Sequence, residues 1–496
     1  MYRKTLCLCL FCLMTAGLCF SQNVVKGVLL DSETNEPIIG ATIVNAATKV
    51  GDVSKLDGSF LLKVPQGNVV LDITYVGYTQ VSQKVTVSGS TTDLGTIYLK
   101  SDAIGLGDVT VTASMAVRRK TPVALSTVEP ITLEVKMGNQ EFPEILKTTP
   151  GVYATKQGGG YGDSRINLRG FESANIAVMV NGVPVNDMEW GGVYWSNWAG
   201  LSDVTRSMQV QRGLGASKIS TPSVGGSINI VTKSTDAKRG GTVFYTIGND
   251  GYLKEGFSVS TGLDKNGWAM TMLGSKTSGN GYVQGTEFES YTYFVNLSKV
   301  LNNHTISFTG FGSPQWHNQR NNSDYLLISE WQKQPLKYRY NASYGFDMNG
   351  QRKVSSRNEY HKPQFSLNHY WTIDETSSLS TALYASIGNG NGYSGQGYSS
   401  DDRTNWFGAS EGVPNTKFRS EDGTFDYGAI YTLNKDNING SQMVMSKSVN
   451  KHRWYGLLST DTKQVDKNLE ISGGVDLRYY KGIHTNVITD LYGGSF

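Results

Sequence analysis

The 496-residue sequence has little cysteine and little histidine, the residues that most often build disulfides and transition-metal sites. All 4 cysteines (Cys7, Cys9, Cys12 and Cys19) fall within the first 21 residues, so the rest of the chain can form neither a disulfide nor a cysteine-ligated metal site. The 6 histidines, at positions 304, 317, 361, 369, 452 and 484, never pair at ligand spacing, and no His-x-x-Glu motif occurs. We therefore predict no catalytic residue, no metal site and no cofactor.

Long hydrophobic runs and a strong excess of one charge are also lacking. The mean hydropathy of −0.31 excludes a protein built from many membrane-spanning helices, but not a transmembrane β-barrel, whose alternating strands average out. The net charge of +3 gives no indication of a nucleic-acid partner. Glycine (57 residues) and aromatic residues (11%) are abundant, which suits hairpin turns and interfacial aromatic girdles. A large secreted β protein would share this composition.

Residues 1–21 are predicted to be a signal peptide. Arg3 and Lys4 precede an apolar run at 6–20 that is too short for an ordinary spanning helix, and small residues allow cleavage before Gln22. The alternative is a lipoprotein acylated on Cys19, which the bulky Leu18 disfavours.

Residues 22–100 are predicted to form a small β-sandwich. Strand-like runs at 24–30, 41–44, 59–64, 69–75 and 83–87 are separated by turn signals such as Asp57-Gly58. Gly27-Val28, Gly40-Ala41-Thr42 and Tyr75-Val-Gly77-Tyr78 resemble motifs of the transthyretin-like carboxypeptidase regulatory-like domain. That domain is an accessory of peptidases and implies no catalysis.

Residues 122–235 are predicted to form an α+β domain. A short helix at 142–147 should end at Thr149-Pro150-Gly151, because proline cannot continue a helix and glycine frees the backbone. Short strands are expected at 166–169, 176–180, 208–211 and 227–232, with a tight hairpin at Asn181-Gly182.

Five motifs in this segment resemble, in order and spacing, those of the plug domain of TonB-dependent receptors. They are Glu144-Ile-Leu-Lys-Thr-Thr-Pro-Gly-Val152, Leu168-Arg169-Gly170, Val180-Asn181-Gly182-Val183-Pro184, Val210-Gln-Arg212-Gly213 and Gly225-Gly226-Ser-Ile-Asn-Ile-Val-Thr-Lys233. In outer-membrane receptors a carboxypeptidase regulatory-like sandwich often precedes such a plug, so the resemblance extends over both segments.

Residues 101–121 read as a linker rich in glycine and small residues. Within it, the run Asp108, Val109, Thr110, Val111, Thr112 and Ala113 looks like a TonB box, the segment that such a receptor offers to its energy-transducing partner. An extended, β-branched peptide can pair with an exposed sheet edge of the partner and resist a pull along the linker. A last sandwich strand or an inert spacer is the alternative.

Residues 236–496 are predicted to form the N-terminal part of an antiparallel transmembrane β-barrel, because alternating strands continue after Lys233. Alternating runs lie at 256–261, 268–272, 291–297, 304–311, 365–371, 379–387 and 469–479; in the last, Leu469, Ile471, Val475, Leu477 and Tyr479 share one face. Long connections at 312–360 and 388–451 are expected outside. About nine or ten strands are expected, against about 22 in plugged transporters, so the chain reads as a fragment ending in a loop.

An aromatic and polar loop of the plug, residues 189–198, is the candidate substrate-binding segment. Trp190, Tyr194, Trp195 and Trp198 lie beside polar groups, which suits recognition of sugars, aromatic chelates or peptides. Packing of these rings against the barrel wall is the equal alternative. Trp316 and His317 are weaker candidates of the same kind.

The resemblance implies an outer-membrane active transporter that imports a scarce nutrient: a ferric chelate, cobalamin, an oligosaccharide or a peptide. Its implied partners are the TonB-ExbB-ExbD complex, the nutrient and outer-membrane lipid, and the sandwich would lie in the periplasm. The alternative is a surface-exposed outer-membrane β protein that binds a ligand or signals without energised transport. Residues 212–227 depart from the plug signature of glycan importers that work with a lipoprotein lid, so no lid partner is predicted.

Overall fold

The computed structural model describes residues 23–32, 35–75, 78–100, 124–128, 133, 140–157, 161–162, 164–213, 223–235, 237–320, 326–398, 409–410, 412–414, 416–466 and 468–496. The chain forms two compact units, residues 1–108 and 109–496. The expected signal peptide and the expected TonB box both lie outside the described residues. Within the described residues, no helix is long and apolar enough to cross a membrane.

The N-terminal unit is a sandwich of two β-sheets. In one sheet, β1 (Asn23–Asp31) pairs antiparallel with β4 (Ser59–Val64) and parallel with β7 (Thr91–Leu99). The other has the order β3-β2-β5-β6, formed by β3 (Gly51–Val53), β2 (Thr42–Asn45), β5 (Gly67–Thr74) and β6 (Val81–Val87). Alternate residues such as Val25, Leu29 and Phe60 are buried between the sheets, which confirms the predicted sandwich. The sequence analysis missed β3 and β7, whose residues are mostly exposed. In β7, Leu94, Ile97 and Leu99 contact the core, but their spacing is not the strict alternation of a strand.

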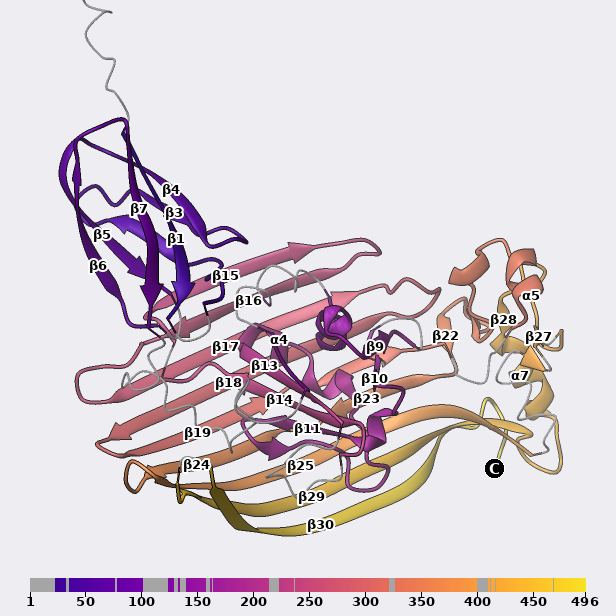
Figure 1. Ribbon diagram of the computed structural model, residues 1–496. Helices are drawn as coiled ribbons and strands as arrows, with labels where there is room; N and C mark the ends of the chain where they lie inside the picture. Colours follow the sequence, from indigo (N-terminus) through magenta and orange to yellow (C-terminus); the bar gives the residue numbers. More distant parts are fainter. Residues whose placement is uncertain are drawn as a thin grey trace, which may run out of the picture. The chain divides into compact units, whose positions relative to one another are not determined.

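The plug is built on a five-stranded sheet with the order β12-β11-β14-β13-β8 (Figure 1). Its strands are β8 (Ala124–Val128), β11 (Ile176–Val180), β12 (Val183–Pro184), β13 (Thr205–Arg212) and β14 (Gly226–Thr232). The central strands β11 and β14 are buried at every residue, so neither alternates in sequence. Asn181 and Gly182 have φ values of 51° and 79°, as the predicted tight hairpin requires.

Short elements connect the plug strands. They are α3 (Phe142–Ile145), η1 (Leu146–Thr148), β9 (Val152–Thr155), β10 (Arg165–Leu168), η2 (Ser173–Asn175), η3 (Trp195–Trp198) and α4 (Leu201–Val204). The predicted helix is present as α3 continued by η1, and it ends before Gly151, whose φ is 79°. β9 and β10 pair antiparallel in a separate two-stranded sheet.

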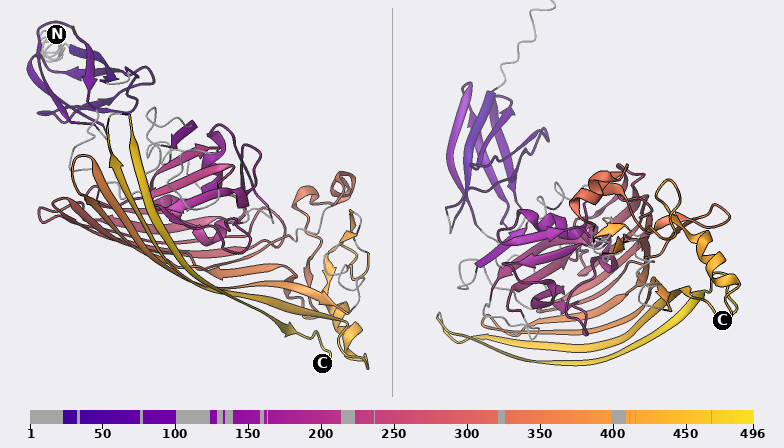
Figure 2. Two further views of the ribbon diagram at one scale, coloured as in Figure 1. Left: turned by 60° about the horizontal axis from the view of Figure 1, so that its bottom comes forward. Right: turned by 90° about the vertical axis from the view of Figure 1, so that its right-hand side faces the viewer.

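A large antiparallel sheet of 11 strands follows the plug. Its strands are β15 (Gly240–Ile247), β16 (Leu253–Ser260), β17 (Trp268–Gly279), β18 (Phe288–Leu301), β19 (His304–Gly312), β20 (Gln315–Asn318), β23 (Arg357–His361), β24 (Gln364–Thr372), β25 (Ser377–Gly397), β29 (Met443–Gln464) and β30 (Glu470–Asp490). β20 and β23 continue β19 and β24, so the described part of the chain crosses the sheet nine times, within the nine or ten strands expected. The sheet is curved, and the plug lies on its concave face (Figure 2).

The outward face of this sheet carries a continuous apolar row. Directly paired residues on seven neighbouring strands are Met270, Leu297, Phe308, Leu367, Leu383, Leu457 and Leu477. The inward face is largely polar, with buried residues such as Ser298, Thr309 and Asn368 turned towards the plug. Apolar residues outside and polar residues inside are the pattern of a transmembrane barrel wall.

This row predicts a depth-dependent cost of charge. Leu383→Arg should destabilise the folded sheet in a bilayer by about 2–4 kcal/mol, because the guanidinium would lie near the middle of the apolar band. Leu379→Arg is the matched control, since it lies on the same face of the same strand, next to Trp371 near the turn, where the cost falls to about 0–1 kcal/mol. Urea unfolding in lipid vesicles measures both. Equal losses for the two variants would contradict the assignment of this face to lipid.

Both sequence-based assignments of the long connections were wrong in their bounds. The connection expected at 388–451 is strand up to Gly397 and again from Met443, and the one expected at 312–360 contains β20 and β23. These ends of the strands lie beyond the apolar band. Their sequences therefore do not show the regular alternation of apolar and polar residues by which the other parts of the strands were predicted. The remaining segments are partly folded into α5 (Ile328–Lys333), η4 (Lys337–Arg339), β21 (Tyr344–Phe346), β22 (Arg352–Val354), β26 (Ala409–Ser410), β27 (Val413–Pro414), β28 (Phe425–Asp426) and α7 (Tyr427–Lys435).

The two long connections pack together. β21 from the first pairs in parallel with β28 from the second, and β22 completes a three-stranded sheet. Phe425, Tyr427 and Ile430 form a buried cluster with Met443 at the start of β29. Because barrel loops are long on the outside and short on the periplasmic side, we take this end of the sheet as the outer end.

Candidate functional site

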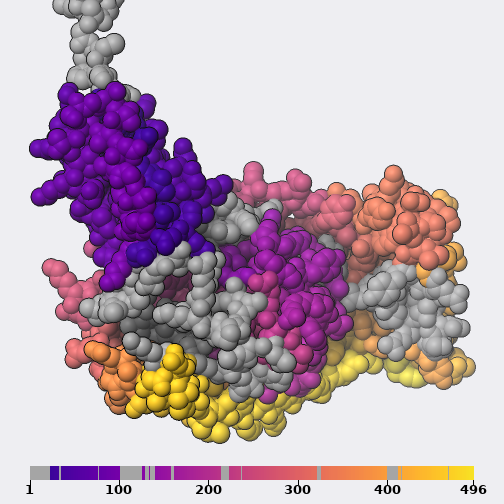
Figure 3. Space-filling view, viewed as in Figure 1, coloured from indigo at the N-terminus to yellow at the C-terminus, as the bar shows by residue number. Residues whose placement is uncertain are grey.

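Three kinds of contact hold the plug against the inward face of the sheet. The buried ring of Trp198 stacks on Phe311 of β19, with ring centroids 5.5 Å apart and planes at 14°. Thr292 of β18 donates from Oγ1 to the carbonyl oxygen of Ala199 over 2.9 Å. The plug therefore belongs to the same packed body as the sheet, and the space-filling view shows it in the hollow of the sheet (Figure 3).

The third contact is an ion pair. Lys254 of β16 approaches Asp203 of α4, with Nζ and Oδ1 2.6 Å apart, and both side chains are nearly buried, at 12% and 14% exposure. Lys233 also donates from Nζ to the backbone oxygen of Asp203 over 3.0 Å. A buried carboxylate depends strongly on its cation, so this pair links the position of α4 to the barrel wall.

Residues 186–198, here called the apical loop, are fixed to the plug by their own hydrogen bonds. The amide of Asn186 accepts from the backbone of Val178 over 2.7 Å and donates to Ile176 and Gly191 over 2.8 and 2.7 Å. The carboxylate of Asp187 accepts from the backbone amides of residues 189 and 190. The loop therefore presents its side chains from a defined backbone.

The four predicted binding residues of the apical loop divide into two groups. Trp190 and Tyr194 are 40% and 56% exposed, and their rings lie 5.0 Å apart. Trp195 and Trp198 are buried at 4% and 2%. Trp198 packs against the barrel wall, as the alternative prediction had it, whereas Trp195 stacks on Phe142 within the plug, with centroids 5.3 Å apart.

Trp316 and His317 were expected in a loop but lie in β20. The guanidinium of Arg357 lies 4.5 Å from the Trp316 ring centre. His317 is 1% exposed, and its Nδ1 is 2.8 Å from Oε1 of Gln315. His317 is therefore placed within the plug–barrel contact rather than in a solvent-exposed loop.

Two clefts lie between the plug and the outer half of the sheet, on either side of Trp195 and Ser196, which line both. The larger, here called the lateral cleft, has a volume of about 720 Å³. The smaller, here called the apical cleft, has a volume of about 300 Å³ and is lined by Trp190 and Tyr194. Both volumes are within the range of small-molecule sites.

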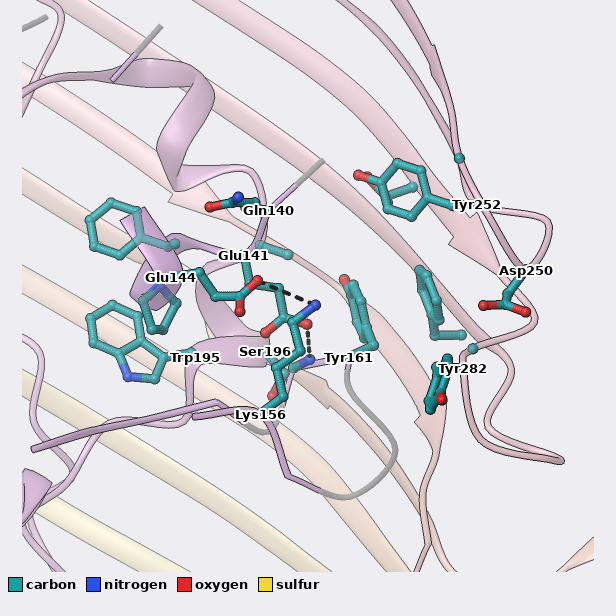
Figure 4. Close-up of a pocket in the computed structure, with 18 of the residues that line it drawn as sticks. Gln140, Glu141, Glu144, Lys156, Tyr161, Trp195, Ser196, Asp250, Tyr252 and Tyr282 are labelled. Atoms are coloured by element: carbon teal, nitrogen blue, oxygen red, sulfur yellow. Dashed lines mark hydrogen bonds and ion pairs between the residues drawn. The ribbon is translucent and has the colours of Figure 1, made fainter. Parts of the chain in front are cut away.

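The lateral cleft has aromatic walls and paired charges. Figure 4 shows Tyr252, Tyr282 and Asp250 on the barrel side and Glu141 and Glu144 on the plug side. Glu141 accepts hydrogen bonds from the backbone of Gly162 and from the hydroxyl of Ser164 over 2.9 and 2.7 Å. These two hydrogen bonds hold Gly162 and Ser164, which lie in the connection between β9 and β10, against the start of α3.

Glu144 remains ionised beside two lysines of the plug. Burial works against the charged carboxylate, but the hydrogen bond from Lys147 (2.6 Å) and the charge of Lys156 (3.3 Å) outweigh it, so the pKa of Glu144 is lowered. Nearby, burial raises the pKa of the Tyr161 phenol, whose ring is stacked on Phe288 with centroids 4.0 Å apart. Tyr161 therefore acts as a neutral packing group.

The apical cleft combines aromatic rings with many carboxamides. Its barrel side carries the side chains of Gln315, Gln319, Asn358 and Asn450, which come from β20, β23 and β29 and from the segment after β20. Asn391 of β25 also borders the cleft, but its side chain lies on the outward face of the sheet beside Glu359. Glu189 of the apical loop is 2.9 Å from Nε2 of His484 on β30. Sequence analysis missed these barrel residues, because nothing local shows which strands face the apical loop.

Within the described residues, no group of three or more His, Cys, Asp or Glu side chains is arranged to hold a metal ion. The clefts instead offer aromatic rings, hydroxyls and amides, which bind ligands without forming or breaking bonds. This arrangement is suited to recognition.

Two family models match the chain. Residues 25–111 match the CarboxypepD_reg-like domain, and residues 117–227 match the TonB-dependent Receptor Plug Domain. These matches confirm the resemblance that the sequence motifs indicated, and they agree with the sandwich and the plug of the structure.

Curated relatives match about a third of the chain. A vitamin B12 transporter, BtuB, of Photobacterium profundum is 31% identical over 160 residues, which are 32% of this chain and 25% of the relative. The ferric enterobactin receptor PirA of Pseudomonas aeruginosa is 31% identical over 158 residues, 29% of this chain and 21% of the relative. The alignments therefore span about a quarter of these relatives.

Solved structures share the fold of the plug and sheet. FpvA of Pseudomonas aeruginosa, bound to a heterologous pyoverdine, superposes with a TM-score of 0.54 at 14% identity, over 76% of this chain and 45% of that one. The ferric citrate transporter FecA in the unliganded form gives 0.51 at 14% identity, over 75% and 50%. The chain spans about half the length of these proteins, which are transporters or receptors and not enzymes.

Proposed function

We propose that this chain, a TonB-dependent receptor, imports a scarce nutrient across the outer membrane into the periplasm. The observation that supports this most is the seating of the plug. Its sheet lies on the polar inward face of a β-sheet whose outward face is a continuous apolar row, and both clefts lie at the end with long connections. Two of the relatives are named as a vitamin B12 transporter and a ferric enterobactin receptor.

In the proposed cycle, the nutrient binds from outside in the clefts beside the apical loop. The partner then adds its sheet edge to residues 108–113, and the TonB-ExbB-ExbD complex supplies force from the inner membrane. The pull would reach the plug at β8, an edge strand that is joined to β13 through five residue pairs. An edge strand can be peeled away one pair at a time, so β8 is where the plug would begin to open.

Strand-blocking substitutions in the proposed TonB box test this function. Val109→Pro with Val111→Pro should abolish growth on the one limiting nutrient that the receptor imports, because proline cannot donate to a β-ladder. Growth on candidate nutrients is compared between cells carrying this variant and the wild type, at equal outer-membrane levels of the two proteins. If growth is unchanged where deletion of the gene impairs it, the protein binds or signals without energised transport.

A further inference from the structure

The chemistry of the apical cleft indicates which class of ligand the proposed transporter recognises. Four barrel residues place carboxamides in the cleft: Gln315, Gln319, Asn358 and Asn450. A carboxamide offers both a donor and an acceptor without a net charge. Such an array matches a ligand that is dense in uncharged hydrogen-bonding groups.

The hydrogen bonds within the array leave acceptors for a ligand. Asn358 donates from Nδ2 to Oε1 of Gln319 over 3.1 Å, and Gln319 donates from Nε2 to the hydroxyl of Ser356 over 3.1 Å. Each of these two carboxamides therefore has an amide N–H directed to a protein partner. The carboxamide oxygen of each has two lone pairs and can take a further hydrogen bond from a ligand hydroxyl.

The opposite wall of the cleft supplies aromatic surface. The exposed rings of Trp190 and Tyr194 come from the apical loop, and the hydrogen bonds of Asn186 and Asp187 fix the backbone beneath them. Rings held in this way can cover an apolar ligand face while the amides opposite bind its polar edge.

The charges that line the cleft show no positive excess. Arg165 is outweighed by Asp187 and Glu189, and the side chain of Lys451 lies on the outward face of β29. Glu189 is engaged by His484, and Asp187 accepts from two backbone amides of its own loop. The described lining therefore carries no surplus of positive charge that would attract an anionic ferric chelate.

From these observations we infer that the apical cleft recognises an uncharged, polyhydroxylated ligand, that is, the end of a neutral oligosaccharide. Hydroxyl groups would bind the carboxamides, and the C–H faces of one or two sugar rings would lie on Trp190 and Tyr194. A cleft of about 300 Å³ is at the lower end of small-molecule sites and suits a ligand of that size. This inference rests on the proposed function, because it identifies the class of nutrient.

Binding to the purified full chain in detergent tests the inference without any energy source. The probes are an array of neutral and acidic glycans, together with ferric enterobactin, ferric citrate and cyanocobalamin. We expect binding to a neutral glycan. Calorimetry on that glycan should show that Asn358→Ala and Gln319→Ala each weaken binding by about 3- to 10-fold, the effect of one lost hydrogen bond.

Asn349→Ala is the matched control, because Asn349 is exposed in the outer connection away from the cleft, and its affinity should equal that of the wild type. Circular dichroism checks that each variant keeps its β-sheet signal. Binding of a ferric chelate or cyanocobalamin that the two cleft variants weaken would overturn the inference, and so would a folded protein that binds no neutral glycan. If growth still depends on Val109 and Val111, either result would contradict only the proposed ligand class and would not contradict energised import.

Discussion

Trp198→Ala should destabilise the packing of the plug against the barrel wall by about 3–5 kcal/mol, the cost of removing a large buried aromatic side chain. The Trp198 ring is 2% exposed and stacked on Phe311 of β19, so its loss opens a cavity where the plug meets the barrel wall. β11 and β14, the buried centre of the plug, should then exchange their amide hydrogens faster. Hydrogen exchange of the protein in detergent measures this directly.

Trp190→Ala is the matched control, because it removes the same side chain from the same loop. Trp190 is 40% exposed, so its removal leaves no closed cavity, and exchange in β11 and β14 should match the wild type. Its effect is expected on ligand binding. Equal acceleration of exchange by the two variants would mean that Trp198 does not anchor the plug to the wall.

Lys254→Met should destabilise the contact between the plug and the barrel wall by a similar free energy. Without Lys254, Asp203 becomes a nearly buried carboxylate that has lost its cation, and breaking such a pair costs about 3–5 kcal/mol. The consequence should be largest at α4, which contains Asp203, and at β13, which follows it in the chain. Limited proteolysis of the plug in outer-membrane vesicles measures the release.

The double variant Asp203→Leu with Lys254→Met separates an ionic contribution from general damage. Replacing both partners of a buried pair with apolar residues is often close to neutral, so the double variant should recover most of the protease resistance. His484→Ala breaks the exposed pair with Glu189, where the side chains are 50% and 44% exposed. It should change the stability of the plug by only about 0–1 kcal/mol and leave the protease resistance near that of the wild type. A double variant as sensitive as Lys254→Met would contradict the pairing.

The plug could be predicted closely from the sequence because its turns depend on local residues. Asn181-Gly182 and Pro150-Gly151 fix a hairpin and a helix end whatever surrounds them. In the barrel, β15 and β29 were not identified as alternating runs, and the ends of the strands that were identified could not be predicted. β25 and β29 continue far beyond the apolar band, where Gly390, Asn391 and Gly392 resemble a loop in composition but pair with their neighbours in register.

The candidate site was predictable only on the plug side. The apical loop is recognisable by its tryptophans, but the sequence cannot separate Trp190, which is exposed, from Trp198, which is buried against a strand more than a hundred residues away. The carboxamides opposite come from separate strands, and only the pairing register brings Asn358 of β23 and Asn450 of β29 to the same face of the sheet, on either side of β25. Their shared location depends on how the strands pair in the sheet, so the local sequence does not show it.

Uptake of a labelled nutrient, chosen from the growth test, decides between energised import and passive binding. Cells with the wild-type receptor are measured with and without a protonophore that collapses the inner-membrane proton gradient. We expect surface binding of the label to persist and its transfer to the periplasm to stop in treated cells, as it should in cells with Val109→Pro and Val111→Pro. Transfer that continues at the same rate without the gradient would contradict a transporter driven through the plug.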